Sequence, residues 1–561
     1  MHVQRPLVLL IRDGWGIGPD YPGNAVTLAA MQHLPRLLKE YPNCRLGAAG
    51  RAVGLRDGIQ GSSEVGHLNM GAGRVVEQEI VRVDKLIASG EFFRHPKLLN
   101  AIENCRRNGS NLHLMGLVQD QGVHATEEHL YALLDLARRQ NFHSVFIHFF
   151  ADGRDTPPQS ALHYLERLEK KIKELGAGRI ATLMGRFYAM DRGKNWDRTR
   201  RAYEALVDGK GLRARSAKEA IEAAYRRTNP DTGGPETDEF IQPTVIVGSH
   251  GTPIATIRAG DSVIFFNFRQ DRAIQLTRAF VEPDFSDFSR GPQPQVFYLG
   301  LTCYYDEFQY YVVPPMNMAN LVGEILSRHG LWQLRISEYQ KYRHVTSFFN
   351  GKRIEPYPRE DRIQVPSITV PEDTKPEMSA YEVTELTVEA ITHGIQAVRE
   401  KARTSDGVTC HFDESLAGER GRDTYDVVVM NYANCDMVGH TGNLGAAIKA
   451  VEVVDRCIGA IAQATLRRGG VLLVTADHGN VEQMMDPVTQ AVQTAHTLND
   501  VDFILVGQEL SRARLRPYGI LSDVGPTMLR LLGIPLPAEM TAAPLIENSL
   551  DFSSVGKGSQ L

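Results

Sequence analysis

Short apolar runs alternate with polar, helix-like stretches along most of the chain. The runs are rich in β-branched and aromatic residues, which is typical of buried strands in mostly parallel sheets. They lie at 7–11, 112–118, 145–150, 180–184, 263–266, 296–301, 427–430, 471–474 and 503–506. Helix-like stretches lie between them, for example at 127–140, 160–175 and 445–466. The alternation predicts an α/β fold.

Charged residues directly follow five of these apolar runs. The letters are IRDGWG after the first run, DGRD after FIHFFA, GR after ATLM, FRQDR after VIFFN and ADHGN after VLLVT. In open α/β sheets, ligands bind beyond the carboxyl ends of the strands. Because all five strand ends carry Asp, His or Arg, the pattern indicates function rather than unrelated loops.

The charged motifs are of two kinds, and they occupy different parts of the chain. Carboxylate and histidine motifs lie near both ends, whereas arginine motifs lie between about 120 and 275. This predicts two α/β domains, with a domain of residues 78–311 inserted into a domain built from residues 1–77 and 312–561. The crossings are expected near 75–81 and 309–316, where QYYVVPPM has the paired prolines of a linker. The polar segment 404–423 is expected to be a surface insertion.

Composition narrows the class of protein. The chain has 561 residues, 42% of them hydrophobic, and a net charge of −5, so it lacks the basic field typical of nucleic-acid binding. No apolar stretch approaches the ~18 residues of a membrane span, and the first apolar run is too short for a signal peptide. The six cysteines form no CxxC pair, which favours reduced thiols. We therefore expect a cytoplasmic protein with neither a nucleic-acid nor a membrane partner.

Residues 61–74, GSSEVGHLNMGAGR, resemble neither an amphipathic helix nor a half-buried strand. Glycine allows close backbone approach to a ligand, and a serine hydroxyl can act as a nucleophile. We interpret the stretch as a nucleophile loop in which Ser63 attacks. An ordinary Gly/Ser surface turn is the competing interpretation.

Candidate metal ligands lie near both ends of the chain. Asp436 and His440 stand four residues apart, so one helical turn could direct both at one ion. The other candidates are Asp13, Asp477, His478 and His496. Mixed carboxylate and imidazole ligands suit Mn²⁺ or Zn²⁺, and this set with Ser63 is large enough for two ions. Taken singly, each Asp could instead cap a helix and each His could be a core residue.

The middle segment carries a candidate binding site for an anion. Arginine pairs bidentately with carboxylate and phosphate oxygens, so several arginines at strand ends suit a small anionic substrate. The candidates are His124, Arg154, Asp155, Arg186, Arg192, Arg269 and Arg272, with Lys341 from the terminal domain. Surface salt bridges are the alternative for the arginines. Asp155 could be a general base or the partner in a structural ion pair.

These motifs together resemble those of a known family. They are SEVGHLNMGAGR, LHLMGL, DGRDTPP, GRFYAMDR, WDRT, FFNFRQDRA, KYRHVT, KPEMSAYEVT, DMVGHTG, TADHGN and TAHT, in this order along nearly the whole chain. The sequence resembles the cofactor-independent (2,3-bisphosphoglycerate-independent) phosphoglycerate mutases of the alkaline phosphatase superfamily. Ser62 stands where that family usually has Asn, and the register with EVGH favours Ser63 as the nucleophile.

The resemblance implies a reaction and a role for each candidate residue. It implies interconversion of 3-phosphoglycerate and 2-phosphoglycerate in glycolysis and gluconeogenesis, through a phosphoserine on Ser63, by a monomer that needs two Mn²⁺ ions and no bisphosphoglycerate. Asp436, His440 and His496 would bind one ion. Asp13, Ser63, Asp477 and His478 would bind the other. The substrate would be bound by His124, Arg154, Asp155, Arg186, Arg192, Arg269, Arg272 and Lys341.

Two other classes of function remain open at this point. One is a different metal-dependent enzyme of the superfamily, such as a phosphopentomutase or a phosphatase. The other is a non-catalytic protein that binds metal or phosphate. Adding glycerate phosphates and pentose phosphates separately would discriminate the first alternative. Loss of Ser63 or of one ligand aspartate would be the sequence signature of the second, and every predicted ligand is present.

Overall fold

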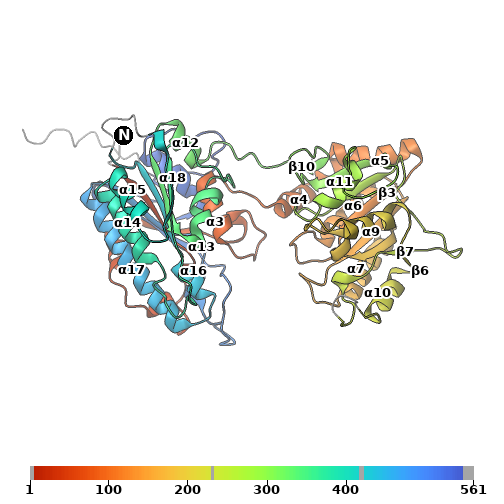
Figure 1. Cartoon of the computed structure of the whole chain (residues 1–561), viewed down its shortest axis with the longest axis horizontal. Helices are drawn as coiled ribbons and strands as arrows, with labels where there is room; N and C mark the ends of the chain where they lie inside the picture. Colours follow the sequence, from red (N-terminus) through yellow and green to blue (C-terminus); the bar gives the residue numbers. More distant parts are fainter. Residues whose placement is uncertain (1–4, 229–232, 416–422, 548–561) are drawn as a thin grey trace, which may run out of the picture. The chain divides into compact units, whose positions relative to one another are not determined.

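The computed structural model describes residues 5–228, 233–415 and 423–547. The chain forms two compact units (Figure 1). The first unit comprises Met1–Glu77 and Asn317–Leu561, and the second comprises Gln78–Met316. The second crossing therefore follows residue 316 rather than 311, because strand β10 (Tyr311–Val313) pairs with β9 (Phe297–Thr302) in the sheet of the second unit.

The first unit is built on a nine-stranded sheet of order β13-β12-β11-β14-β1-β15-β16-β2-β17. Its strands are β1 (Leu7–Arg12), β2 (Asn43–Gly47), β11 (Gln333–Glu338), β12 (Glu360–Val365), β13 (Thr409–His411), β14 (Val427–Tyr432), β15 (Val471–Ala476), β16 (Val501–Val506) and β17 (Tyr518–Ile520). β1 runs parallel to β14 and β15, with Arg12 level with Tyr432 and Ala476. The loops that follow these three strands consequently leave one edge of the sheet side by side.

Helices cover both faces of this sheet. They are α1 (Ala25–Leu28), α2 (His33–Glu40), α3 (Ser63–Ala72), α12 (Val322–Arg328), α13 (Tyr339–Arg343), α14 (Ala380–Thr392), α15 (Ile395–Thr404), α16 (Asn434–Gly439), α17 (Leu444–Arg467) and α18 (Val524–Leu531). Figure 1 shows α14, α15 and α17 on one face and α3, α12 and α18 on the other. The strands of the centre, β1, β14 and β15, are buried throughout, as apolar runs covered on both sides must be.

The second unit is built on an eight-stranded sheet of order β10-β9-β8-β3-β4-β5-β7-β6. The strands not yet given are β3 (Leu112–Leu117), β4 (Val145–Ala151), β5 (Arg179–Gly185), β6 (Leu212–Ala214), β7 (Thr244–Ile246) and β8 (Ser262–Phe265). Its helices are α4 (Glu79–Ala88), α5 (Pro96–Asn108), α6 (Glu127–Arg139), α7 (Ala161–Leu175), α8 (Arg186–Ala189), α9 (Trp196–Val207), α10 (Ala217–Tyr225) and α11 (Ile274–Val281). β8, β3, β4 and β5 are parallel neighbours, so the loops after them also share one edge.

The predicted α/β class is confirmed, and each of the nine apolar runs forms a strand. Strands β11 and β12 were not predicted, because QLRISE and EDRIQV lack an apolar run. Their charged side chains are nevertheless buried: Arg362 pairs with Glu360 at 2.7 Å, and Arg399 of α15 donates two hydrogen bonds to Asp361 at 2.8 Å. Pairing offsets part of the cost of burying these charges, which allows charged residues in strands at this place in the sheet.

The expected surface insertion at 404–423 is only partly a loop. Residues 416–422 lie outside the described residues, but Thr409–His411 forms β13 and pairs antiparallel with β12 at the end of the sheet. The backbone N–H of Asp413 also donates to Asp361 at 2.9 Å. The described part of this segment thus completes the sheet instead of standing apart from it.

The prediction that residues 61–74 form a loop is wrong, because Ser63–Ala72 forms helix α3. The helix is buried almost all round, which explains the absence of amphipathic periodicity. Its glycines permit this burial. A Cβ at Gly66 would lie 2.7 Å from Asp477 Cβ, and a Cβ at Gly71 would lie 2.0 Å from the carbonyl oxygen of Phe349.

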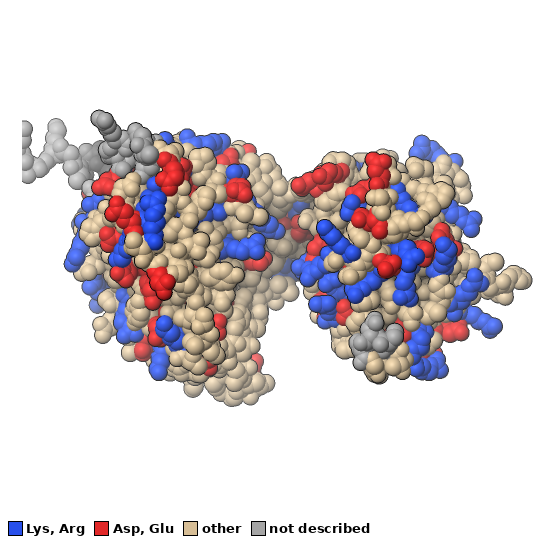
Figure 2. Space-filling view, in the orientation of Figure 1, with Lys and Arg blue, Asp and Glu red and all other residues tan. Residues whose placement is uncertain are grey.

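The charges on the surface are mixed in sign, and the cysteines are reduced, as the composition predicts. Lys and Arg are interspersed with Asp and Glu over the face that Figure 2 shows. All six cysteines are free. Among the described residues, no helix is long and apolar enough to cross a membrane.

Two buried histidines, His113 and His148, lie on the neighbouring strands β3 and β4 of the second sheet. From them we predict that the stability of this unit depends on pH. His148 is fully buried, with Nδ1 2.9 Å from Thr182 Oγ1 and Nε2 3.0 Å from His113 Nδ1. Burial, with His113 next to it, holds the pKa of His148 well below its usual value. The unfolded imidazole takes up a proton near pH 6.5 but the folded one does not, so stability falls as pH drops below about 6.5, by at most ~1.4 kcal/mol per pH unit.

Hydrogen exchange of the β3 and β4 amides at pH 7 and pH 5, corrected for the intrinsic rate, measures this effect. As the pH is lowered from 7 to 5, the free energy of local opening should decrease less in His148→Gln than in the wild-type protein. His143→Gln, at an exposed position just before β4, is the matched control. An identical pH slope in His148→Gln and wild type would show that His148 is not the group responsible.

Candidate active site

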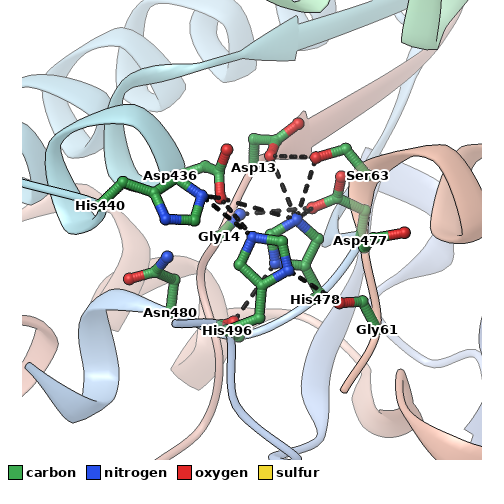
Figure 3. Close-up of polar contacts among 12 residues, drawn as sticks. Asp13, Gly14, Gly61, Ser63, Asp436, His440, Asp477, His478, Asn480 and His496 are labelled. Atoms are coloured by element: carbon green, nitrogen blue, oxygen red, sulfur yellow. Dashed lines mark hydrogen bonds and ion pairs between the residues drawn. The ribbon is translucent and has the colours of Figure 1, made fainter. Parts of the chain in front are cut away.

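The predicted metal ligands of the first unit converge at one edge of its sheet. Asp13 follows β1, Asp477 and His478 follow β15, and the loop after β14 leads into α16, which carries Asp436. Figure 3 shows these side chains with His440, His496 and Ser63 pointing toward one another. The carboxylates of Asp13, Asp436 and Asp477 and the imidazole of His478 are buried. The parallel register of β1, β14 and β15 is what brings these distant residues together.

Ser63 lies at the centre of this group. It is the first residue of α3, and its Oγ lies 2.9 Å from Asp13 Oδ1 and 3.0 Å from His478 Nε2. Lys341 of α13 donates to the same Oγ at 2.7 Å. Ser62, in contrast, is the N-cap of α3, and its Oγ accepts a hydrogen bond from Val65 N at 3.4 Å. The geometry therefore makes Ser63 the nucleophile candidate, at a helix N-terminus that favours negative charge.

Backbone carbonyls orient two of the histidine rings. His440 Nδ1 lies 2.8 Å from Thr494 O, and His496 Nδ1 lies 2.8 Å from Gly61 O. A carbonyl oxygen only accepts, so each Nδ1 carries the proton and each Nε2 faces inward, 3.2 and 3.0 Å from Asp436 Oδ1. In this tautomer the Nε2 atom of each ring is the one available to a metal ion.

Lys341 and the histidines compensate the charge of the buried carboxylates. The ammonium of Lys341 donates to Asp13 Oδ1 at 2.7 Å and to Asp436 Oδ2 at 2.6 Å. Burial opposes ionisation, but Lys341 outweighs it and holds the pKa of Asp13 and of Asp436 well below the usual range. Burial likewise opposes protonation of His478, yet Asp477 and the other carboxylates raise its pKa to about 10.

This donor set fits divalent metal ions. Three buried carboxylates share the space with imidazole nitrogens, and buried Asp436 Oδ1 and Asp477 Oδ2 accept no hydrogen bond. The raised pKa of His478 means that a proton balances charge there, and a metal ion would replace that proton. Among the described residues, two triads have ligand atoms within 4.8 Å of one another: Asp436, His478 and His496, and Asp13, His67 and Asp477.

His67, which sequence reasoning did not select, is better explained as a support than as a ligand. Its Nδ1 lies 2.9 Å from Ser63 O and 3.2 Å from Asp477 Oδ2. Its Nε2 lies 3.2 Å from Asn431 Nδ2, which also donates to Asp13 Oδ2 at 2.8 Å. Since Ser63 O and Asn431 Nδ2 already partner the two ring nitrogens, His67 supports the start of α3 and leaves His478 to complete the set.

The predicted anion-binding residues lie in the second unit, except for Lys341, which belongs to the first unit and contacts Ser63. His124 follows β3, Arg154 and Asp155 follow β4, Arg186 begins α8 after β5, and Arg269 and Arg272 follow β8. Arg186 is almost fully buried and donates to Asp152 Oδ1 at 2.6 Å and to Asp155 Oδ2 at 2.5 Å. The ion-pair interpretation of Asp155 thus has a defined partner, and its other carboxylate oxygen is left for a ligand.

A second carboxylate, Asp271, connects the rest of the set. Its Oδ2 accepts from Arg192 at 2.5 Å, and its Oδ1 lies 3.3 Å from Arg269 Nε and 3.7 Å from His124 Nδ1. Burial, together with the positive charge of Arg186, lowers the pKa of His124 to about 4. At neutral pH His124 is therefore an uncharged group that can donate or accept a hydrogen bond.

Like charges crowd around Arg272. Its guanidinium donates to the carbonyl oxygen of Met190 at 3.1 Å, and burial lowers its pKa, as do the charges of Arg186, Arg192 and Arg154. Arg154 is more exposed, with its nearest carboxylate, Glu239, 3.4 Å away. Crowded guanidinium groups repel one another until an anion binds among them, so this edge suits an anionic substrate.

Sequence reasoning missed several supporting residues. Asp152 and Asp271 lie inside the motifs ADGRD and FRQDR, directly after strands, so the same rule that selected their neighbours could have selected them. Asp191 accepts from the backbone N–H groups of Gly193 and Asn195, both at 2.9 Å, and so shapes the turn after Arg192. Nothing in the sequence pattern marks Asn431, because its partners come from other segments.

Comparison with known proteins places this geometry in a family. A family model for the N-terminus of BPG-independent phosphoglycerate mutases matches residues 83–306, and a model of the metalloenzyme superfamily matches residues 409–536. The chain is 50% identical to the 2,3-bisphosphoglycerate-independent phosphoglycerate mutase of Moorella thermoacetica, over 97% of this chain and 99% of that protein. It is 48% identical to the enzyme of the same name from Desulforudis audaxviator, over 97% and 100%.

A solved structure gives the same answer. The crystal structure of Leishmania mexicana phosphoglycerate mutase at low cobalt concentration is 32% identical, covers 98% of both chains and has a TM-score of 0.61. Full-length relatives of one activity confirm the resemblance drawn from the motifs and favour the mutase over the phosphatase, phosphopentomutase and non-catalytic alternatives. The chain belongs to the family of 2,3-bisphosphoglycerate-independent phosphoglycerate mutases.

Proposed function

We propose that this mutase interconverts 3-phosphoglycerate and 2-phosphoglycerate through a phosphoserine on Ser63. The observation that carries the proposal is the position of Ser63 Oγ, within 3.0 Å of Asp13, His478 and Lys341. In the first step the bond between Oγ and phosphorus forms and the bond from phosphorus to the glycerate 3-oxygen breaks. The hydroxyl gives up one proton and the departing oxygen takes one, so the step is balanced.

Two divalent ions, Mn²⁺ by our proposal, would be held by the ligands that converge on Ser63. Asp436, His440 and His496 would hold one, and Asp13, Ser63, Asp477 and His478 the other. Bound there, the ions would lower the pKa of the serine hydroxyl and compensate phosphoryl charge. Lys341 contributes a further positive charge 2.7 Å from Oγ, which would stabilise the added oxygens of the phosphoryl group.

The glycerate would be bound by the charged residues of the second unit. The arginines suit its carboxylate by bidentate pairing, and neutral His124 suits a hydroxyl. Asp155, held by Arg186 at 2.5 Å, is placed by the proposal to exchange a proton with the glycerate hydroxyls. The residues of this proposed site are His124, Arg154, Asp155, Arg186, Arg192, Arg269 and Arg272. We also propose that the enzyme acts as a monomer.

The test is conversion of 3-phosphoglycerate to 2-phosphoglycerate with no bisphosphoglycerate added. Conversion should be present in Mn²⁺, should be lost after EDTA treatment, and should return when Mn²⁺ is restored. Undiminished turnover in EDTA would contradict the metal requirement. Release of free phosphate in place of 2-phosphoglycerate would contradict the return of the phosphoryl group from Ser63 to glycerate.

A further inference from the structure

One fully buried carboxylate next to the proposed metal ligands has so far been given no role. Glu482 lies in the short 3₁₀ turn Val481–Gln483 and has no exposed surface. It follows the strand-end pair Asp477 and His478 by only a few residues. It is not among the side chains whose ligand atoms cluster around Ser63.

Three loops donate hydrogen bonds to this one carboxylate. Gly16 N, from the loop after β1, donates to Oε2 at 2.9 Å, and Asn480 N, from the loop after β15, donates to the same oxygen at 2.8 Å. Oε1 accepts from the Thr497 hydroxyl and, at 3.0 Å, from Asn499 Nδ2, both in the loop of His496. All four donors are neutral, so the carboxylate is satisfied entirely by groups that fix loop positions.

Each of these loops carries a proposed metal ligand close to its bond with Glu482. Asp13 lies three residues before Gly16, His478 lies two residues before Asn480, and His496 is adjacent to Thr497. Two backbone bonds reinforce the connection. Val481 N donates to Gly14 O at 3.2 Å, and Thr497 N donates to Gly479 O at 3.0 Å.

The carboxylate packs closely against two glycines. A Cβ on Gly16 would lie 2.4 Å from Glu482 Oε1, and a Cβ on Gly479 would lie 2.2 Å from that oxygen and from Thr497 Oγ1. Glycine is therefore required on both sides of the side chain, and the three loops pack directly against it.

We propose that Glu482 is a positioning residue that fixes the loops of Asp13, His478 and His496 relative to one another and thereby sets the metal affinity of the site. The inference rests on the proposed ligand set. Metal–ligand distances tolerate deviations of about 0.2 Å, so loops that shift independently would bind an ion more weakly. Residues that orient ligands typically change metal affinity by about 10–100-fold when they are replaced.

Glu482→Gln tests this with little change in volume. The amide keeps an acceptor for Gly16 and Asn480 but presents N–H groups to the donor of Asn499. We expect the Mn²⁺ dissociation constant, measured from the EPR signal of free Mn²⁺, to rise about 10–100-fold. Saturating Mn²⁺ should restore kcat to within about threefold of wild type, since Glu482 acts only through the ligands. Glu509→Gln, at an exposed position in another 3₁₀ turn, should leave the dissociation constant unchanged.

Asp436→Asn, which alters a proposed ligand directly, separates the possible outcomes. If it weakens Mn²⁺ binding while Glu482→Gln stays within threefold of wild type, Glu482 has no positioning role and the ligand set stands. If Asp436→Asn has no effect, or if the wild type binds no Mn²⁺, the ligand set and the inference both fail. A lower melting temperature in EDTA with an unchanged Mn²⁺ dissociation constant would make Glu482 merely structural.

If Glu482→Gln does not fold, Thr497→Val tests the same proposal, because it removes one hydrogen-bond donor to Glu482. Its Mn²⁺ dissociation constant should rise at least threefold, and a smaller change would reject the positioning role.

Discussion

Replacing Ser63 by alanine is expected to lower mutase turnover by about 10⁴-fold or more, because the proposed mechanism has no step without its oxygen. The fold should be retained. Ser63 is buried but small, its backbone begins α3 whatever its side chain, and alanine is a good helix former. Substrate conversion in saturating Mn²⁺, with circular dichroism as the check on folding, measures the effect.

Ser62→Ala is the matched control for this change. Ser62 caps α3, so its replacement should cost ~1 kcal/mol of stability but leave turnover near the wild-type level. Quenching the wild type during turnover should give a phosphorylated tryptic peptide 57–74, whose only serines are Ser62 and Ser63. Phosphate on Ser62, or an active Ser63→Ala protein, would reject Ser63 as the nucleophile.

The sheets could be predicted from the sequence only where burial and apolar composition coincide. The run at 471–474 is apolar because both neighbours of β15 and the helices on either face exclude water from it. β12 is almost as buried, yet it accommodates Glu360, Asp361 and Arg362 because partners from β11, α15 and their own strand neutralise them. Such pairings join residues far apart in sequence, so a local pattern does not reveal them.

The same reasoning applies to the candidate site. Asp13, Asp477 and Arg186 could be selected because each directly follows an apolar strand, and parallel strands end at one edge. Glu482 could not, because its partners are mainly backbone and hydroxyl groups on three loops that only the folded chain brings together. Helix α3 could not be predicted from the sequence either, because a helix buried on nearly all sides shows no amphipathic periodicity.

Replacing Lys341 by methionine is expected to separate catalysis from metal binding. Lys341 is buried, and although burial alone would lower its pKa, Asp13 and Asp436 raise that pKa above the usual range. Because the pKa of Lys341 is higher in the folded than in the unfolded protein, its protonation stabilises the fold. This stabilisation is complete below the unfolded pKa of about 10.4 and is lost only as pH rises through the folded pKa, so it is fully present at pH 7.5. Removing the partner of buried carboxylates costs ~3–5 kcal/mol, so metal-free Lys341→Met should unfold at a lower urea concentration than the metal-free wild type.

Mn²⁺ should reverse that loss of stability but not the loss of activity. A divalent ion at Asp13 and Asp436 compensates the charge that the ammonium compensated, so we expect the variant to bind Mn²⁺ at least as tightly as the wild type. Turnover at saturating Mn²⁺ should still be about 10²–10³-fold lower, because the phosphoryl group on Ser63 lacks the positive charge 2.7 Å from Oγ. Lys449→Met, on the exposed side of α17, controls for loss of a lysine. Weaker Mn²⁺ binding by Lys341→Met, by more than tenfold, would instead assign Lys341 to the metal site and reject its action on the phosphoryl group.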